Sequence, residues 1–484
     1  MQRTVPARQV ASLVAGFGTA PAYRGLAESL RVVITDGRIP AGVRLPSERQ
    51  LTSALGVSRT TVTRAYAELR DHGFLVSRQG SGWVATLPKA RGRRGDHLLP
   101  VGDQPLGKID LTMAAPAAGA GIMAAYHWAA AQLPGYLAGA GYHPAGLPEL
   151  REAVAASYAG RGLPTDPDQI MIVPGALAAV AIAARALVRP GARVLLESPV
   201  YPNAIATFTR AGARVCGVNA GEPGGADTWA GDVSTAARQI RPAVAYLIPD
   251  FHNPTGALRS GGDRRHVADA LRRTGTTAVV DESNVQLNLD GVGMPAPFAS
   301  HHPDTLTVGS LSKSCWAGLR IGWLRVPDAH MEEITRARLS MDLGSPVLEQ
   351  LAAIRLTGDS GLLGQRLRQL RSSRDAALDA LARHLPEWPV RRPAGGLHLW
   401  CTLPEPLSSA LAARAEEHDV VLAAGPEFAP EGGLDRFIRI PFTQPADVLT
   451  DAIARLARAW RETLADPRSP QRARERRSVT TLVS

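Results

Sequence analysis

Between residues 170 and 309, short β-branched runs alternate with helical segments. The runs cover residues 170–173, 193–197, 214–218, 243–248, 277–281 and 305–309. Parallel strands need a crossover of a dozen or more residues between them, and helices supply it. The alternation therefore predicts an α/β fold, in which a mostly parallel sheet has helices on both faces.

The chain is long enough for more than this one sheet. It has 484 residues, of which 45% are hydrophobic, enough for one large core and a smaller one. We expect a first domain over 20–87, a flexible linker rich in proline, glycine and arginine over 88–108, and the α/β domain over 109–463. Residues 346–463, together with 109–145, are expected to form a smaller lobe of that domain.

The sequence predicts neither export nor membrane insertion. The longest apolar stretch, 175–188, is interrupted by Arg185 and is shorter than the roughly 20 residues that span a bilayer. No apolar stretch of the signal-peptide kind follows the N-terminus, so we expect a cytoplasmic protein. The arginine-rich tail 464–484 is expected to be disordered. The cysteines, Cys216, Cys315 and Cys401, are far apart and predict reduced thiols, with no disulfide framework and no metal site.

Residues 22–86 predict three short helices followed by a β-hairpin, an α+β unit. A capping box that starts at Ser47 opens the second helix, and Ser58 caps the third. The apolar stripe of the third helix consists of Val62, Ala65, Tyr66 and Leu69. A glycine turn over 79–82 joins two strand-like runs, so the pattern is that of a winged helix-turn-helix.

The charge of the chain is unevenly distributed. The net charge is +10, and residues 1–100 hold 15 Lys/Arg against 6 Asp/Glu. A local excess of this size suggests a polyanion as the partner of the N-terminal region. A solvated basic terminus without a partner is the alternative on charge alone.

The third helix has the residues that a DNA-reading helix needs. A helix-turn-helix places the first residues of its second helix in the major groove, where Arg59 can contact guanine through two hydrogen bonds. The neighbouring threonines can bind phosphates or touch thymine methyl groups. An ordinary helical hairpin with a polar outer face is the alternative on periodicity alone.

Three motifs carry a family resemblance. They are LPSERQL at 45–51, GVSRTTV at 56–62 and RQGSG at 78–82. In their order and spacing, residues 20–87 resemble the GntR family of bacterial winged-helix repressors. The resemblance implies double-stranded promoter DNA as a partner. The residues expected to contact it are Arg44, Ser47, Arg49, Ser58, Arg59, Thr60, Thr61, Thr63, Arg64, Arg78 and Gly80.

Lysine is almost absent from the chain. Of the 54 Lys and Arg residues, only Lys89, Lys108 and Lys313 are lysine. A guanidinium does not lose its proton near neutral pH, so an arginine cannot form a Schiff base. The first two lysines lie in the predicted linker, whereas Lys313 follows the run at 305–309. Lys313 is therefore the candidate for an aldimine with the aldehyde of pyridoxal 5'-phosphate.

Other strand ends offer partners for the same cofactor, because ligands gather at the carboxyl ends of parallel strands. Asp281 could keep the pyridine nitrogen protonated, and Asn253 could hydrogen-bond the phenolic oxygen. Tyr201 could stack on the ring, or could be ordinary core packing. The candidates for the phosphate are Gly175, Ala176, Leu177, Ser310, Ser312 and Arg320. Each residue taken alone also has a purely structural explanation.

The motifs of the large domain resemble one family when they are taken in order. They are GYHPAG at 141–146, PGA at 174–176, NPTG at 253–256, SLSK at 310–313 and GLRIG at 318–322. Nearly all of 109–463 is similar to the class I/II aminotransferases of fold type I, which have a small C-terminal lobe. The resemblance implies that Tyr142 reaches the cofactor phosphate of a neighbouring subunit. It also implies that Arg439 binds the α-carboxylate of an amino acid.

The sequence departs from that family at two places. Ser283 and Asn284 follow the Asp281–Glu282 pair, where the family usually has a tyrosine that donates to the phenolic oxygen. Ala176 and Leu177 stand where hydroxyl or amide side chains are frequent. Cofactor affinity and the tuning of the aldimine therefore stay open.

The combination of the two domains resembles the MocR subfamily of GntR regulators, apart from the ends of the chain. The resemblance implies a homodimer, arranged head to tail, that binds promoter DNA. It also implies that the large domain senses pyridoxal phosphate, or a small amine or amino acid, through the aldimine at Lys313. Two alternatives remain: a working aminotransferase with an autoregulatory N-terminal domain, and a cofactor-free interaction protein. A regulator with weak transaminase activity is also compatible with the sequence.

Overall fold

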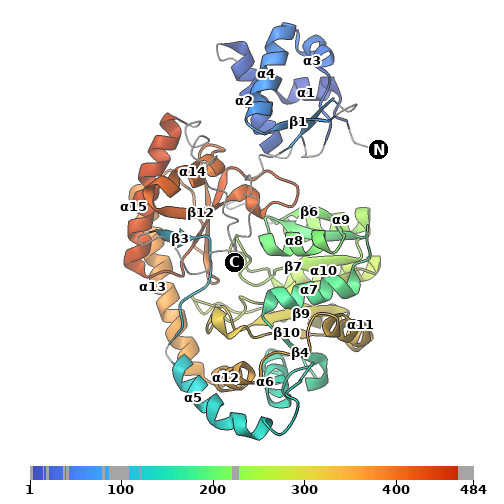
Figure 1. The fold of residues 1–484 in the computed structure, drawn as a ribbon, viewed down its shortest axis with the longest axis vertical. Helices are drawn as coiled ribbons and strands as arrows, with labels where there is room; N and C mark the ends of the chain where they lie inside the picture. The colour runs from blue at the N-terminus through green and yellow to red at the C-terminus, as the bar shows by residue number, and fades with distance from the viewer. Residues whose placement is uncertain are drawn as a thin grey trace.

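The computed structural model of the chain comprises two bodies, an N-terminal domain and a much larger domain (Figure 1). The structure describes residues 4–14, 16–17, 21–35, 39, 43–78, 82–86, 108–119, 121–220 and 228–466. Residues 79–81 of the predicted turn at 79–82, residues 88–107 of the predicted linker and residues 467–484 of the predicted tail at 464–484 lie outside these residues. Among the described helices, none is both long and apolar enough to cross a bilayer.

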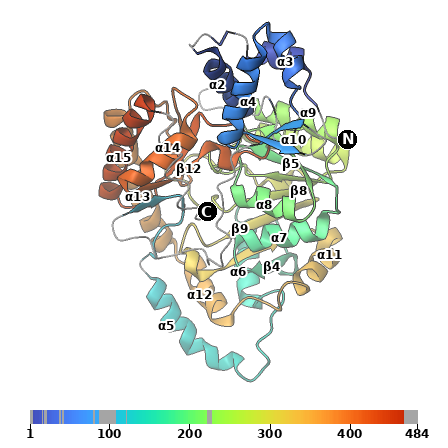
Figure 2. The ribbon, with the colours of Figure 1, turned by 45° about the horizontal axis from the view of Figure 1, so that its top comes forward.

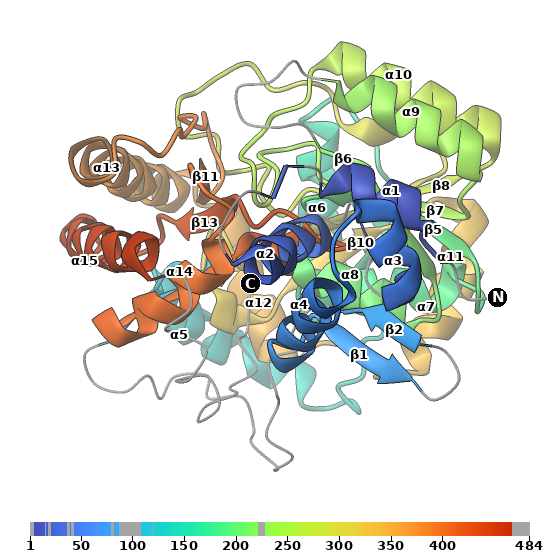
Figure 3. The ribbon, with the colours of Figure 1, turned by 90° about the horizontal axis from the view of Figure 1, so that it is seen from above.

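The N-terminal domain consists of helices and one antiparallel hairpin. Its elements are α1 (Ala7–Leu13), α2 (Ala22–Thr35), α3 (Glu48–Leu55), α4 (Arg59–Asp71), β1 (Leu75–Arg78) and β2 (Gly82–Ala85). The three predicted helices and the hairpin are confirmed, and α1 is an additional helix that packs on α3. Figure 3 shows α3, α4 and the hairpin from above.

Local signals in the sequence account for the ends of these helices. The predicted capping box is present, because the Ser47 N–H donates to the Gln50 side chain at 2.9 Å and the Gln50 N–H donates to the Ser47 hydroxyl at 3.3 Å. Gly56 ends α3 with φ of 67°, a left-handed conformation that favours glycine. The predicted apolar stripe of α4 is buried, and the Tyr66 hydroxyl donates to the Pro46 carbonyl at 3.0 Å.

The larger domain is built around a seven-stranded sheet. Its strands are β4 (Ile170–Val173), β5 (Arg193–Ser198), β6 (Arg214–Asn219), β7 (Val244–Leu247), β8 (Thr277–Asp281), β9 (Thr305–Ser310) and β10 (Gly322–Arg325). Their order in the sheet is β4-β10-β9-β8-β7-β5-β6. β10 is the one strand of this sheet that runs in the direction opposite to the other six. The predicted α/β fold with a mostly parallel sheet is confirmed.

Helices bury both faces of this sheet, as the continuous apolar runs predict. One face packs against α7 (Ala176–Leu187), α8 (Pro202–Arg210) and α11 (Asp328–Leu339), and the other against α9 (Trp229–Ile240) and α10 (Gly261–Thr274). Alternate residues of β5 serve the two layers, with Val194 and Leu196 on one face and Leu195 on the other. Figure 2 shows the two helical layers on either side of the strands.

A second, four-stranded sheet forms a separate core. Its strands are β3 (Ile109–Leu111), β11 (His398–Thr402), β12 (Val420–Ala424) and β13 (Phe437–Pro441), in the order β11-β13-β12-β3. One face of this sheet packs against α13 (Ser360–His384), α14 (Ser408–Ala415) and α15 (Ala446–Ala465). Residues 109–111 thus complete a sheet whose other strands come from the C-terminal part of the chain.

A third group of helices lies at the β4 edge of the large sheet. It consists of α5 (Ile122–Gln132), α6 (Pro148–Ala159) and α12 (Val347–Thr357), which share one apolar cluster with β4 and β10. Short 3₁₀ helices connect the larger elements: η1 (Leu133–Tyr136), η2 (Pro167–Gln169), η3 (Phe298–Ser300), η4 (Ala317–Leu319), η5 (Glu416–His418) and η6 (Gly425–Phe428). The carboxyl ends of β7, β8 and β9 meet at one edge of the large sheet, where ligands bind in open α/β sheets.

Candidate cofactor site and DNA-binding surface

Lys313 lies in the turn that follows β9, at the carboxyl edge of the large sheet. Its Nζ donates a hydrogen bond to the backbone oxygen of Ala114, 2.9 Å away. Burial, together with the positive charge of Arg439, lowers the pKa of Lys313 from its usual 10.5 to about 8. An amine with this pKa is partly neutral near physiological pH, so Nζ can attack a carbonyl carbon.

Asp281 ends the neighbouring strand, β8, and each of its carboxylate oxygens accepts a hydrogen bond. The hydroxyl of Tyr246 on β7 donates to Oδ2 at 2.7 Å, and the backbone N–H of Ser283 donates to Oδ1 at 2.8 Å. The residue is buried. Its carboxylate therefore has one orientation, as pairing with a ring nitrogen requires.

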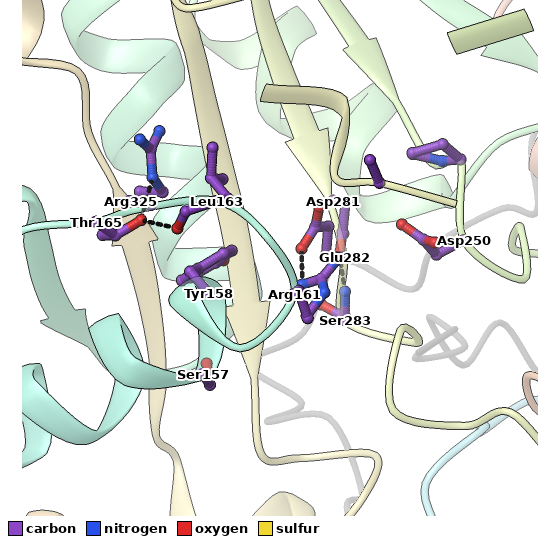
Figure 4. Close-up of polar contacts among 12 residues, drawn as sticks. Ser157, Tyr158, Arg161, Leu163, Thr165, Asp250, Asp281, Glu282, Ser283 and Arg325 are labelled. Atoms are coloured by element: carbon purple, nitrogen blue, oxygen red, sulfur yellow. Dashed lines mark hydrogen bonds and ion pairs between the residues drawn. The ribbon is translucent and has the colours of Figure 1, made fainter. Parts of the chain in front are cut away.

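Glu282, the next residue, takes part in a different contact. Arg161, which follows α6, donates to its Oε2 at 2.5 Å, and the Glu282 side chain is 1% exposed (Figure 4). Burial raises the pKa of Glu282, while Arg161 opposes that rise. The pair joins the end of α6 to the residue that follows Asp281.

The candidates for the phosphate meet where β4, β10 and β9 lie side by side. Ser310 on β9 is opposite Gly322 on β10, which in turn is opposite Val173 on β4. The Ser310 hydroxyl donates to Ser312 Oγ at 2.9 Å, so the two predicted serines lie together.

Gly175 and Arg320 complete this group. Gly175 has φ of +89°, and a Cβ placed on it would lie 2.6 Å from Nη2 of Arg320. Only glycine therefore lets this guanidinium, which donates to the Pro174 carbonyl at 2.7 Å, lie against the first turn of α7. A guanidinium, two hydroxyls and a helix N-terminus form a suitable site for a dianion. Ala176 and Leu177 offer backbone N–H groups only, as their side chains predict.

Arg439 lies on β13, fully buried, and connects several candidates. It donates to the Asn253 side-chain oxygen at 3.3 Å and to the backbone oxygen of Thr112. Burial lowers its pKa from 12.5 to about 10. Burial also raises the pKa of Tyr201, and the Asn203 side chain donates to the Tyr201 hydroxyl at 2.9 Å.

Tyr142 lies away from this group in its own chain. It is 66% exposed, in the connection between η1 and α6, and its hydroxyl makes no hydrogen bond to another described residue. The structure thus brings the other cofactor candidates together and leaves Tyr142 at the surface.

Sequence reasoning missed three residues of the site, Tyr246, His252 and His398. Tyr246 holds Asp281, and His252 lies 3.4 Å from Glu197 through its Nε2. His398 is buried near Lys313 and Arg439, whose charges contribute to lowering its pKa. A polar residue between the buried Leu397 and Leu399 of a strand was the available signal, because alternate strand residues face opposite sides.

The departure at Asn284 also has a structural outcome. Its side-chain nitrogen donates to the Phe251 carbonyl at 2.9 Å. Asn284 therefore supports the loop after β7, where the predicted Asn253 lies.

In the N-terminal domain, most predicted DNA contacts are exposed. The exposed residues include Arg49, Arg59 and Thr60, the last two in the first turn of α4. Nothing in the described part of this domain covers them. The α4 N-terminus therefore presents short polar and long basic side chains, as major-groove reading requires.

Several other predicted contacts are engaged within the domain. The Ser58 hydroxyl caps α4 by accepting from the Thr61 N–H at 3.1 Å, and the Thr63 hydroxyl donates to Glu48 at 2.7 Å. Arg64 lies over the ring of Tyr23, with 5.3 Å between guanidinium and centroid. These contacts orient the side chains at the surface.

Two more predicted contacts concern the hairpin. Arg44 lies against β2, because a Cβ on Gly82 would be 3.3 Å from its Nη2. Gly80 and the side chain of Arg78 lie outside the described residues.

Models of two protein families match the chain. Residues 22–84 match the gntR family of bacterial regulatory proteins, and residues 138–456 match aminotransferase class I and II. Each matched range lies within one of the two bodies of the structure.

Similar proteins include regulators and enzymes. An uncharacterized HTH-type transcriptional regulator, YisV of Bacillus subtilis, is 28% identical over 79% of this chain and 84% of its own. A probable rhizopine catabolism regulatory protein, MocR of Rhizobium meliloti, is 29% identical over 76% of this chain and 78% of its own. Among solved structures, the α-aminoadipate aminotransferase LysN of Thermus thermophilus is 29% identical, with a TM-score of 0.68, and covers 74% of this chain and 94% of its own.

Proposed function

We propose a function from the premise that this chain belongs to the aminotransferase class I and II family and carries a gntR-family DNA-binding domain. It is a transcription regulator that binds promoter DNA through α3, α4 and the hairpin. Its large domain senses pyridoxal phosphate, or an amino compound that reaches the cofactor. This function places the protein in the cytoplasm, where promoter DNA lies.

The residues around Lys313 fit pyridoxal phosphate by their chemistry. Lys313 supplies a nucleophilic amine, Asp281 an oriented carboxylate for the ring nitrogen, and Asn253 an amide for the phenolic oxygen. Arg320, Ser310, Ser312 and the α7 N-terminus supply the phosphate site, and Tyr201 a ring face. When bound, the cofactor supplies an aldehyde that condenses with primary amines.

One observation carries the sensing function: the two ligand-binding cations hold the start of the large domain. Residues 112–117, called the entry segment here, continue directly from β3, which begins one residue after Lys108. Lys313 donates to the Ala114 carbonyl, and Arg439 donates to the Thr112 carbonyl. Both groups thus contact the first described residues of the large domain.

A third cation reinforces this connection. Arg366 on α13 donates to the Ala117 carbonyl at 2.6 Å and to the Cys315 carbonyl at 3.0 Å. It therefore ties the end of the entry segment to the turn that contains Lys313.

Ligand binding then has a mechanical consequence. If the cofactor were held at Lys313, Nζ would no longer be free to donate to Ala114, and a carboxylate bound by Arg439 would compete with the Thr112 carbonyl for its guanidinium. A ligand that stabilises one arrangement of that segment shifts its population, and the linker carries the difference to the DNA-binding domain. Couplings of this kind change affinity by roughly 5- to 150-fold.

We propose further that the regulator is a head-to-tail homodimer. Tyr142 is 66% exposed, and Met123, Trp128 and Leu137 of the adjoining α5–η1 region are also exposed. An apolar surface of this kind next to Tyr142 supports the idea that Tyr142 completes the phosphate site of a neighbouring subunit.

A working aminotransferase is the second candidate, because Lys313, Asp281 and Arg439 are all present and oriented. Burial leaves Lys313 with a pKa of about 8, which suits proton transfer near neutral pH as well as sensing. A coupled assay with amino acids and 2-oxoglutarate measures turnover directly.

The test of the regulator is binding of the purified protein to the DNA upstream of its own gene, with and without pyridoxal phosphate, at two salt concentrations. We expect specific, salt-sensitive binding that changes with the cofactor. In Lys313→Ala the affinity should no longer depend on the cofactor, whereas Lys89→Ala should behave as the wild type. Wild-type affinity that ignores both pyridoxal phosphate and added amino compounds would contradict sensing and favour the enzyme.

A further inference from the structure

His398 lies on the same face of the small sheet as Arg439. It begins β11, and Trp400, two residues later, is directly opposite Arg439 on β13. Side chains alternate along a strand, so His398 and Trp400 point the same way as Arg439. Leu397, just before the strand, and Leu399 and Cys401, which alternate with His398 and Trp400, belong to the apolar core on the other face.

His398 is buried without a hydrogen bond. It is 2% exposed, and within the described part of the chain neither Nδ1 nor Nε2 has a hydrogen-bond partner. Buried polar groups in native proteins are nearly always paired, because an unpaired one loses its bonds to water without compensation. An imidazole with both nitrogens unpaired, beside a ligand site, therefore suggests a partner that arrives with the ligand.

The titratable groups that act on His398 come from three separate elements. They are Arg439 on β13, Lys313 after β9 and His252 after β7. Burial first, and then these groups, lower the pKa of His398 well below its usual value. The ring is thus neutral and offers one N–H donor and one acceptor, in surroundings that favour an anionic group.

The backbone of His398 also touches the predicted ring-binding loop. Gly256, the last residue of the NPTG turn, lies so that a Cβ on it would be 3.6 Å from the His398 carbonyl oxygen. Asn253, in the same turn, accepts from Arg439. His398 therefore lies beside the loop that carries Asn253, the partner of Arg439, and the charge of Lys313 acts on it as well.

We propose that His398 is a specificity residue that donates a hydrogen bond to the carboxylate of an amino acid whose amino group lies at Lys313. Arg439 alone already donates to Asn253 and Thr112, so His398 supplies a second, independent donor for that carboxylate. The site then selects amino acids over amines that lack a carboxylate. The proposal rests on the sensing function, since the amino compound must enter this site.

The experiment uses the full-length protein loaded with pyridoxal phosphate and three pairs of probes that differ only in the carboxylate. The pairs are L-alanine with ethylamine, L-leucine with isopentylamine, and L-lysine with cadaverine. The change in cofactor absorption on titration gives the apparent Kd for each probe. We expect the wild type to bind the amino acid of at least one pair more tightly than its amine.

Two substitutions of His398, whose new side chains have nearly equal shape, test the role of its N–H donor. His398→Leu has none, and should weaken amino acid binding about tenfold, the loss of one hydrogen bond to a charged group, with little change for the amine. His398→Asn keeps an N–H donor and should retain more of the preference. Asparagine is smaller than histidine and leucine is close to it in volume, so neither adds a long side chain to the site. His384→Leu, at an exposed position on the end of α13, is the control and should match the wild type.

The outcomes separate this proposal from the sensing function. If His398→Leu keeps the wild-type preference, or weakens amine and amino acid equally, the role of His398 is wrong while sensing stands. Equal wild-type affinity within every pair also overturns it, without any substitution. If no probe changes the absorption or DNA binding of the wild type, sensing of amino compounds fails, and the role of His398 fails with it; sensing of pyridoxal phosphate is decided separately by the DNA-binding test with and without the cofactor.

Discussion

The two domains of this protein present their functional residues in opposite ways. In the N-terminal domain, Arg59 and Thr60 are exposed on one helical turn, and local caps position them. In the large domain, Lys313, Asp281 and Arg439 come from three different elements and lie in or near the core. A surface that meets a large, charged partner needs little burial, whereas a small-molecule site needs groups that converge from several elements.

The largest effect we expect comes from Lys313→Ala, which changes the buried site of the large domain and leaves the exposed DNA-binding residues in place. The variant should lose the visible absorption of covalently bound cofactor completely, because none of the neighbouring side chains is an amine. Its DNA affinity without cofactor should shift from that of the wild type without cofactor, because the variant also lacks the Lys313 donor to Ala114. An unchanged cofactor spectrum would show that another group holds the cofactor.

Removal of the Arg161 side chain tests how far the large domain depends on buried charge. Arg161→Met leaves the nearly inaccessible Glu282 carboxylate without its partner at 2.5 Å. We expect the free energy of unfolding to fall by about 3 kcal/mol, measured by chemical denaturation. Arg272→Met, which removes a surface pair with Asp269, should cost less than about 1 kcal/mol. Equal costs would mean that burial does not set the strength of the first pair.

Arg59→Ala changes the exposed DNA-binding surface and leaves the buried site of the large domain in place. A bidentate contact to guanine contributes about 1–3 kcal/mol, so specific DNA affinity should fall about tenfold or more. Cofactor absorption and thermal stability should not change, because the side chain has no buried contact. Arg70→Ala, at the other end of α4, is the control and should change affinity about twofold at most. A larger effect of Arg70 would place the DNA elsewhere on α4.

The pH dependence of cofactor attachment should distinguish the buried site from the DNA-binding surface. With a pKa of about 8, the Lys313 amine is about 10% neutral at pH 7 and about 90% neutral at pH 9. Because the neutral amine is the nucleophile, the rate of cofactor attachment should rise about tenfold over that range, followed by stopped-flow absorption. None of the expected DNA contacts is Lys313, so DNA binding without cofactor is the control and should show no such rise. A loading rate that falls with pH would contradict the assignment.

The smallest effect concerns a helix cap. Ser47→Ala removes the hydroxyl that accepts from the Gln50 N–H, and should lower the stability of the N-terminal domain by about 1 kcal/mol. Differential scanning calorimetry should show a lower transition for this domain and an unchanged one for the large domain. A shift of both transitions would mean that the two domains unfold together.

Much of the fold was predictable because its signals are local. The six strands from β4 to β9 follow from short β-branched runs, and the ends of α3 from Ser47 and Gly56. The candidate site was predictable to the same extent, since strand ends at one sheet edge bring Asp281 and Lys313 together. The additional helix α1 was not predicted.

Other features of the site gave almost no signal in the sequence. Tyr246 looks like any buried tyrosine of a strand, and its bond to Asp281 depends on the pairing of β7 with β8. His398 looks like one polar residue in an apolar run. Its role depends on the register between β11 and β13, which sequence periodicity does not determine.

By itself, the sequence determined the two kinds of domain, the DNA-reading helix and the identity of the lysine, because periodicity, caps and residue chemistry act over a few positions. Only the tertiary structure decided how Lys313 and Arg439 hold the entry segment, through contacts that span 199 and 327 positions of the chain. Such contacts form only once separate elements have packed, since nothing local brings the two partners together. The link between ligand site and linker is therefore a property of the fold.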